Sequence, residues 1–308
     1  MPEQDASRPS RPLSGFAKAL IVLFIVAAIA FFGMVTAVAG LIGRASEEAD
    51  APHLVLLKIE GPIFDSEPWL TLIDRIADDE TCRGVLVRIE SPGGAVASSQ
   101  ELYTSLKRLR EKDVPVVVSL GNVAASGGYY TALAGEKIFS NPGTLTGSIG
   151  VIFQFPEVGE LLDKAGISLQ TVKSGALKDV GSPARKATAS ELAYLQNVID
   201  DTYAQFVEDV SEGRGIPVDS LKRLADGRVF TGRQALAAGL VDTLGGLNEA
   251  KDYLVARSAS EEDIPWTIEP RPRSRVERFF DPEAESELSE LVTGVRERFS
   301  PGAFFLWP

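Results

Sequence analysis

Residues 114–128 read VPVVVSLGNVAASGG, a mostly apolar run that ends in a loop of small residues. The first part, 114–120, predicts a strand buried on both faces, because its apolar residues do not alternate with polar ones. The second part, 121–128, predicts a loop whose glycines let the backbone turn tightly into a helix. A buried strand that leads through such a loop into a helix is the repeating unit of a parallel α/β sheet.

A second unit of the same kind comes just before it. Residues 84–90, GVLVRIE, predict another buried strand, and the loop SPGG at 91–94 follows and opens a helix. Strands and helices that alternate in this way predict an α/β fold with a mostly parallel sheet flanked by helices. Further strands are predicted over 54–59, 137–140, 149–153, 167–172, 228–232 and 240–242. Helices are predicted over 69–79, 156–165, 189–213, 233–238 and 247–257, and the spacing of Leu102, Leu106 and Leu109 predicts one more.

Residues 19–43, ALIVLFIVAAIAFFGMVTAVAGLIG, form an uncharged apolar run. A helix of this length exceeds the roughly 30 Å hydrocarbon core of a bilayer, so the run predicts a transmembrane helix. Cleaved signal peptides have shorter apolar cores, although the A-x-A pattern at 37–39 leaves cleavage as the alternative. More basic residues precede the run than follow it, which predicts a cytoplasmic N-terminus and an extracytoplasmic domain, periplasmic if the host has an outer membrane.

These features divide the chain. After residue 258 the sequence is acidic and broken by prolines, with a polar helix predicted over 283–299 and an apolar end, AFFLWP. We expect that end to dock on this protein, on a neighbouring subunit or on the bilayer. The predicted parts are a cytoplasmic segment over 1–18, the transmembrane helix over 19–43, a linker over 44–52, the folded domain over 53–258 and a tail over 259–308.

Composition removes several functions. A net charge of −12 makes nucleic-acid binding a poor hypothesis, because phosphate needs basic patches. The single cysteine, Cys82, excludes an internal disulfide and a Cys₂His₂ zinc site, and we expect it to be a partly buried small apolar residue. The single histidine, His53, starts the first predicted strand, so we do not expect it in a Ser-His-Asp triad. A hydrolase built on this chain therefore needs a different base.

The loops at 91–94 and 121–128 are expected to meet, because ligands of open parallel sheets bind beyond the carboxyl ends of the strands. One backbone amide from each loop could hold the oxyanion of acyl transfer. Ser126 lies where the second helix begins, so its hydroxyl can face the same space. Neither loop has the phosphate-loop or dinucleotide-loop pattern, and the hydrolase elbow G-x-S-x-G is also missing from them.

A serine hydroxyl needs a base to accept its proton, and lysine is the remaining candidate. The pKa of a lysine, ordinarily about 10.4, falls when the amine is buried. Lys178 follows a predicted strand and lies among small and apolar residues. Residue chemistry alone does not choose among Lys137, Lys164, Lys173, Lys178 and Lys186.

Several motifs, in order along residues 53–250, resemble the signal peptide peptidase A family, membrane-bound serine proteases of the ClpP/crotonase-like fold. SPGG alone also occurs in ClpP-type proteases, whereas the whole set is specific. The motifs are SPGG at 91–94, NVAASGGYY at 122–130, TGSIGV at 146–151, KSGALKD at 173–179 with SP at 182–183, RVFTGRQAL at 228–236, GLVD at 239–242 and GG at 245–246.

The resemblance implies a role for each matching residue. Ser126 matches the nucleophile, and Lys178 matches the general base of a Ser–Lys dyad. Ser148 matches a serine that orients the lysine. The backbone amides of Gly94 and Gly127 match the oxyanion donors. The resemblance also implies that the lysine is kept neutral by burial and that no cofactor or metal is needed.

The short length resembles the single-domain form of the family. That form implies a homo-oligomeric ring in which Ser126 and Lys178 of one site come from neighbouring chains. The implied function is a membrane-anchored endopeptidase that degrades signal peptides after their release from preproteins, and other apolar peptides. The alternatives are a SohB-like or stomatin-linked protease with other membrane-protein substrates, a crotonase-like acyl-CoA enzyme, and a non-catalytic scaffold.

Overall fold

The computed structural model describes residues 31–34, 36, 51–260, 263–269 and 304–306. The chain separates into two units, Met1–Ala51 and Pro52–Pro308, and each is described by itself. Residues 31–34 and 36 of the first unit are helical. The rest of the predicted transmembrane segment, 19–43, lies outside the described residues, as does the helix predicted over 283–299. In the described part of the chain, no helix is both long enough and apolar enough to cross a membrane.

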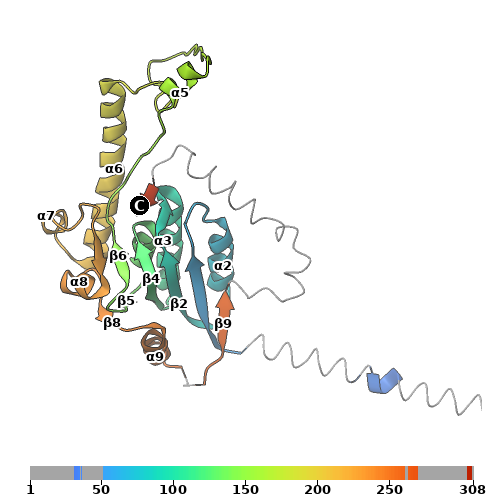
Figure 1. The fold of residues 1–308 in the computed structure, drawn as a ribbon. Helices are drawn as coiled ribbons and strands as arrows, with labels where there is room; N and C mark the ends of the chain where they lie inside the picture. Colours follow the sequence, from blue (N-terminus) through green and yellow to red (C-terminus); the bar gives the residue numbers. More distant parts are fainter. Residues whose placement is uncertain (1–30, 35, 37–50, 261–262, 270–303, 307–308) are drawn as a thin grey trace, which may run out of the picture. The chain divides into compact units, whose positions relative to one another are not determined.

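The second unit is built on a sheet that has eight strands among the described residues (Figure 1). Its main path runs β7-β6-β4-β2-β1-β9, and β5 and β8 extend from β4. Every pair is parallel except β6 with β7, so the mostly parallel sheet is confirmed. The strands are β1 (His53–Glu60), β2 (Cys82–Ser91), β4 (Val116–Ala125), β5 (Lys137–Ser140), β6 (Leu145–Gly147), β7 (Val229–Thr231), β8 (Thr243–Leu244) and β9 (Trp266–Glu269).

Helices cover both faces of this sheet. Successive side chains of a strand point to opposite faces, and since both sets are apolar here, each face needs helices to bury it. Val85, Val87 and Ile89 join one core with α2, α3, α4 and α6, whereas Leu86 joins a smaller core with α9. The flanking helices are therefore confirmed. The helices are α2 (Glu67–Ala77), α3 (Val96–Glu111), α4 (Gly127–Ala132), α5 (Gly159–Lys164), α6 (Ala189–Arg214), α7 (Val218–Leu221), α8 (Gly232–Ala237) and α9 (Leu247–Arg257).

Three predicted strands are wrong. Residues 240–242 form a bend, and the strand β8 begins only after them, at Thr243. Residues 149–153 do not form a strand, because Gly147 and Ser148 both have positive φ and turn the chain after the short strand β6. Residues 167–172 do not form one either, and their apolar side chains are exposed. An apolar run without a neighbouring strand has no partner for its backbone, so periodicity alone misassigns it. Conversely, β9 lies in the stretch predicted as a tail and pairs with β1.

The segment 153–188, called the arm below, connects the sheet to the start of α6. It carries α5 and lies at the end of α6 that is remote from the sheet (Figure 1). The first and last parts of the arm are hydrogen-bonded to each other: the Val158 amide donates to the Pro183 carbonyl oxygen, at 2.7 Å. Most of its side chains are exposed in the single chain.

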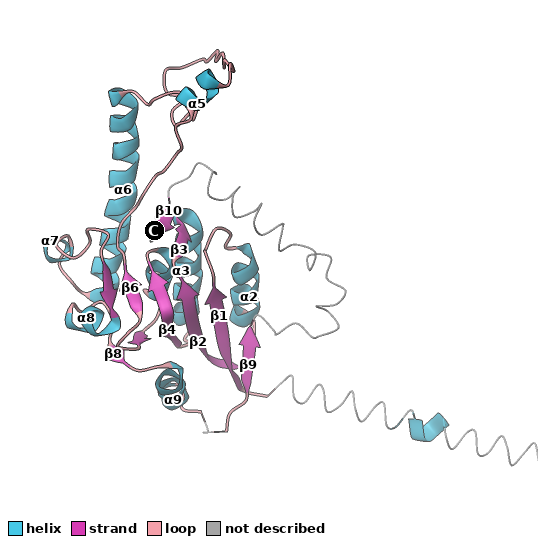
Figure 2. Cartoon of the chain, in the orientation of Figure 1, coloured by secondary structure: helices cyan, strands magenta, loops and turns pink. Residues whose placement is uncertain are grey.

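A second, two-stranded sheet lies beside the first loop. The strand β3 (Gly93–Ala95) pairs antiparallel with β10 (Phe304–Leu306), as Figure 2 shows. The apolar C-terminal end therefore pairs with this chain's own domain, one of the three docking partners expected from the sequence.

Candidate active site

Ser126 lies between β4 and α4 in a strained conformation, with φ 53° and ψ −117°. Such a backbone costs a residue other than glycine about 1–3 kcal/mol and is found mainly at functional sites. The side chain is fully buried, and its hydroxyl oxygen has no hydrogen-bond partner among the residues that the structure describes. Buried polar groups are nearly always paired. Ser126 is therefore both strained and unsatisfied, as expected of a nucleophile awaiting a partner.

The two glycines predicted as oxyanion donors lie next to each other and close to Ser126. A Cβ atom on Gly127 would lie 3.2 Å from the amide nitrogen of Gly94 and 2.3 Å from the Ser99 hydroxyl oxygen. A Cβ on Gly94 would lie only 2.1 Å from the carbonyl oxygen of Ile63. Neither position has room for a side chain. The structure thus brings the loops 91–94 and 121–128 together, as the sequence predicted.

The amide of Gly94 points to the edge of β3 that pairs with β10. The neighbouring residues Gly93 and Ala95 both bond to the backbone of Ile63, through the Gly93 carbonyl and the Ala95 amide, each at 2.8 Å. Since successive amides of a strand point to opposite sides, that of Gly94 faces away from Ile63, toward the edge where β10 pairs. This edge can accept an extended peptide, and in this chain it holds residues 304–306.

Glu90 shapes the loop that leads to Ser126, and the sequence analysis did not identify it. Its carboxylate accepts hydrogen bonds from the amides of Asn122, at 2.8 Å, and Val123, at 3.1 Å. β4 has a bulge at this point, so these amides bond to a side chain of β2 and not to its backbone. The strand consequently continues to Ala125 instead of ending at residue 120. The sequence did contain one sign of this role, since Glu90 is a charged residue at the end of a strand predicted to be buried.

Ser148 follows β6 and is nearly buried, with φ 50°. Its amide donates to the carbonyl oxygen of Arg228, at 2.9 Å. A cavity of about 420 Å³ opens beside it, with both polar and apolar side chains in its wall. The lining residues on α6 are Gln196, Ile199, Asp200 and Tyr203.

Lys178 is not brought to Ser126 within one chain. It lies on the arm with an exposed side chain, whereas the buried Ser126 hydroxyl has no partner in the described part of the chain, Lys178 included. The burial expected of the lysine is therefore absent from the single chain. Among its rivals, Lys173 and Lys186 pair with carboxylates of the arm. Lys137 lies over an aromatic ring, 4.5 Å from its centroid.

His53 and Ser126 lie at opposite ends of the parallel strands. His53 begins β1, whereas Ser126 follows the carboxyl end of β4, and both strands run in the same direction. The length of β1 alone separates these two ends by roughly 20 Å. His53 instead contacts Asp79, with 3.5 Å between Nε2 and Oδ2. A triad with this histidine is excluded.

Comparison with known proteins supplies the family. The model of peptidase family S49 matches residues 108–260, a range that includes Ser126, Ser148 and Lys178. A protein of Synechocystis sp. named "Putative protease slr0021" is 46% identical over 204 residues, which cover 65% of this chain and 73% of the relative. The chain belongs to peptidase family S49. It is a serine peptidase of the α/β class.

Two further relatives are also named as peptidases or proteases. The "Putative signal peptide peptidase SppA" of Enterococcus faecium is 37% identical over 221 residues, 68% of this chain and 64% of the relative. The "Putative protease MJ0651" of Methanocaldococcus jannaschii is 34% identical over 207 residues, 67% of this chain and 66% of the relative. The chain thus spans about two thirds of the length of these two relatives.

Proposed function

We propose that this S49 peptidase is a membrane-anchored endopeptidase that degrades signal peptides after their release from preproteins, with Ser126 as nucleophile and Lys178 as general base. The observation that carries this proposal is the buried, strained and unpartnered Ser126 beside the amides of two glycines that tolerate no side chain. The E. faecium relative whose name includes signal peptide peptidase supports the substrate class. The assignment to the ClpP/crotonase-like fold belongs to the same proposal.

The proposed reaction is acyl transfer to a serine. The Ser126 Oγ attacks the carbonyl carbon of the scissile peptide bond, and its proton passes to the Lys178 amine. The amides of Gly94 and Gly127 donate to the oxyanion. The lysine then protonates the departing amine. A water molecule attacks the acyl-serine as it gives a proton to the lysine, and the lysine passes this proton to the Ser126 oxygen when the acyl bond breaks. Ser148 orients the lysine in this scheme.

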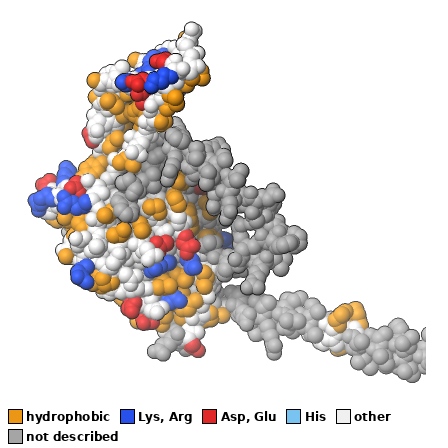
Figure 3. Space-filling model, in the orientation of Figure 1, with side chains coloured by type: hydrophobic (Ala, Val, Ile, Leu, Met, Phe, Trp, Pro, Cys, Tyr) orange, Lys and Arg blue, Asp and Glu red, His pale blue; other side chains and the backbone are white. Residues whose placement is uncertain are grey.

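The separation of Ser126 and Lys178 supports sites that are shared between chains. The arm exposes apolar side chains that a monomer leaves in water, among them Leu161, Leu169 and Val172, the last fully exposed. On the face in Figure 3, hydrophobic side chains surface around α5 next to charged ones. Exposed apolar surface of this kind is typical of an interface. We therefore propose a homo-oligomeric ring in which the arm of one chain brings Lys178 to the Ser126 of its neighbour.

Two features support the substrate class and the place of action. The antiparallel pairing of β10 with β3 supports binding of an extended substrate peptide along the same edge through its backbone, the general mode of strand addition. The apolar run at 19–43 supports a single-pass anchor in the cell membrane, with the protease domain outside the cytoplasm. Such a position holds the site near apolar peptides left in the bilayer.

A serine-reactive fluorophosphonate probe tests the nucleophile on the full chain. We expect labelling of the wild type and none of Ser126→Ala. Hydrolysis of a synthetic signal peptide should be lost in both Ser126→Ala and Lys178→Ala, with assembly retained. Mixing these two inactive variants should restore part of the activity if the sites are shared. Hydrolysis that persists in Lys178→Ala would rule out the dyad.

A further inference from the structure

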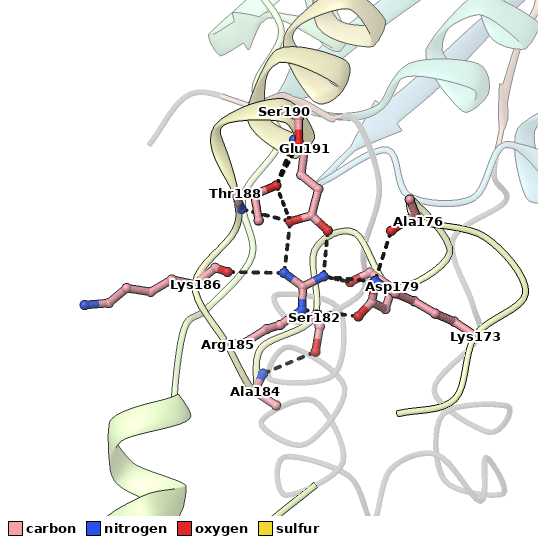
Figure 4. Close-up of polar contacts among 10 residues, drawn as sticks. All are labelled: Lys173, Ala176, Asp179, Ser182, Ala184, Arg185, Lys186, Thr188, Ser190 and Glu191. Carbon is pink, nitrogen blue, oxygen red and sulfur yellow. Dashed lines mark hydrogen bonds and ion pairs between the residues drawn. The ribbon is translucent and has the colours of Figure 1, made fainter. Parts of the chain in front are cut away.

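Arg185 is the centre of an ion network in the arm (Figure 4). Its guanidinium donates to both carboxylate oxygens of Glu191, at 2.6 and 2.9 Å, in the forked geometry that makes such pairs strong. The same group donates from Nε to Asp179 Oδ2, at 3.2 Å, and forms an ion pair with Asp179 Oδ1, 2.9 Å from Nη2. One cation thus bridges two carboxylates that lie twelve positions apart in sequence.

Glu191 connects this network to α6. It is the third residue of that helix, and its carboxylate also accepts the Thr188 amide, at 2.8 Å, while its own amide donates to the Thr188 hydroxyl, at 3.2 Å. This reciprocal capping box fixes the first turn of the helix. The Glu191 side chain is only 5% exposed. Hydrogen bonds from Arg185, and then from Thr188, lower its pKa to about 2.

Asp179 connects the network to Lys178, its neighbour in sequence. Its carboxylate also accepts the Lys173 amine, and that amine donates to the Ala176 carbonyl oxygen, at 3.0 Å. The hydrogen bonds from Lys173, and then from Arg185, lower the pKa of Asp179. The turn that carries Lys178 is thereby held at both of its ends, through Lys173 and through Asp179.

The basic side chains of the arm differ in whether they form ion pairs. Lys173, Arg185 and Lys186 all pair with carboxylates. Lys178 makes no ion pair or side-chain hydrogen bond with any residue that the structure describes, although a carboxylate stands next to it in sequence. A lysine that acts as a base must lose its proton, and a carboxylate partner would favour the protonated form. The network keeps Asp179 occupied by other cations.

We propose that Asp179, Arg185 and Glu191 are positioning residues for the general base: they fix the turn that carries Lys178 onto the first turn of α6 and leave the lysine amine unpaired. This inference rests on the proposed dyad. The orientation of Lys178 then depends on the two-pronged contacts of the Arg185 guanidinium, which the single ammonium group of a lysine cannot reproduce.

The test compares Arg185→Ala and Arg185→Lys with Lys186→Ala in the full chain. The control removes a neighbouring cation of the same arm, whose pair with Glu160 is exposed and 3.6 Å long. We expect kcat for a fluorogenic apolar peptide to fall at least about tenfold in Arg185→Ala, with KM changed less than about twofold. Arg185→Lys should fall between Arg185→Ala and the wild type, and the control should match the wild type.

Two further measurements separate positioning from a general structural role. Added guanidinium ion at millimolar concentration should restore part of kcat in Arg185→Ala, and should have no such effect on Lys178→Ala. Mixing Arg185→Ala with Ser126→Ala should also restore activity, because the second variant supplies an intact arm. Assembly and melting temperature of Arg185→Ala, followed by light scattering and calorimetry, should stay near the wild-type values.

The outcomes distinguish the two proposals. Wild-type kcat in Arg185→Ala, with Ser126→Ala and Lys178→Ala inactive, would overturn the positioning network alone. Loss of assembly in Arg185→Ala, without rescue by guanidinium or by mixing, would also overturn it in favour of a structural role. Activity retained in Lys178→Ala would instead remove the proposed dyad on which the inference rests.

Discussion

The backbone amide of Ser126 donates to the carbonyl oxygen of Gly147, 2.8 Å away. Gly147 directly precedes Ser148. This backbone hydrogen bond therefore fixes the position of Ser126 relative to Ser148, the two serines of the proposed site. All three residues have positive φ, of 53°, 76° and 50° along the chain. Glycine adopts such a φ without cost, so the strained residues are the two serines. Strain of this kind persists only where the surrounding fold determines it, and here it lies at the proposed site.

The strain predicts that Ser126→Gly is more stable than Ser126→Ala. Both variants lose the hydroxyl, but only glycine adopts φ 53° without steric cost. The relief of about 1–3 kcal/mol exceeds the extra entropy that glycine loses on folding, about 0.4–1 kcal/mol. We expect the free energy of unfolding of the glycine variant to be larger by roughly 1 kcal/mol. Urea unfolding of both inactive variants measures this difference.

Ser105, half-buried in the interior of α3, provides the matched control. Glycine there should be less stable than alanine by about 1 kcal/mol, because glycine is the poorer helix former. The two sites should therefore show differences of opposite sign. The same sign at both sites would mean that the backbone at Ser126 is unstrained.

Gly94→Ala should abolish peptide hydrolysis and lower the melting temperature. The new Cβ would overlap the Ile63 carbonyl oxygen at 2.1 Å, and a backbone atom cannot move aside as a flexible side chain can. The shift of β3 that follows would displace the amide proposed to hold the oxyanion, a loss of about 10²–10³ in kcat for one donor. Steady-state kinetics and calorimetry measure the two effects. Gly143→Ala is the control, since nothing lies within 4 Å of its Cβ position, and activity in Gly94→Ala equal to this control would disprove the oxyanion role.

The sheet and the loop that carries Ser126 could be predicted because local patterns encode them. The apolar runs at 54–59, 84–90 and 114–120 predict the buried strands β1, β2 and β4, and the glycines after the last run place Ser126 at the start of a helix. The proposed role of Ser126 as nucleophile came from the family resemblance. The absence of a useful histidine also followed from counting, and the position of His53 at the opposite end of the strands agrees.

The rest depended on contacts between distant residues. Glu90 supports the bulge in β4 through amides more than thirty positions away, which no local pattern encodes. The choice of Lys178 came from family resemblance, because its environment is formed outside its own chain if the sites are shared. The network of Arg185 had one local sign, the T-x-x-E capping box at 188–191, which the sequence analysis did not use.

Cys82 should resist alkylation in the folded protein. Its thiol is buried at the start of β2, and desolvation raises its pKa to about 11, so the reactive thiolate is scarce at pH 8. We expect iodoacetamide to modify it only after urea unfolds the domain, with mass spectrometry as the readout. Fast modification without urea would contradict the burial of this edge of the sheet.

Acid should weaken the arm through Glu191. Because its pKa is lowered from 4.5 to about 2 in the folded chain, chiefly by Arg185, its ionised form stabilises the fold in full above pH 4.5. That contribution declines as the pH falls from 4.5 toward 2, where the folded-state carboxylate also takes up a proton. The stability difference between wild type and Glu191→Gln, from urea unfolding, should therefore be constant from pH 7 to pH 5 and shrink below it. Glu160→Gln, in an exposed pair of the same arm, should differ little from wild type throughout, and a Glu191 difference that did not change with acid would show that the carboxylate is not held by Arg185.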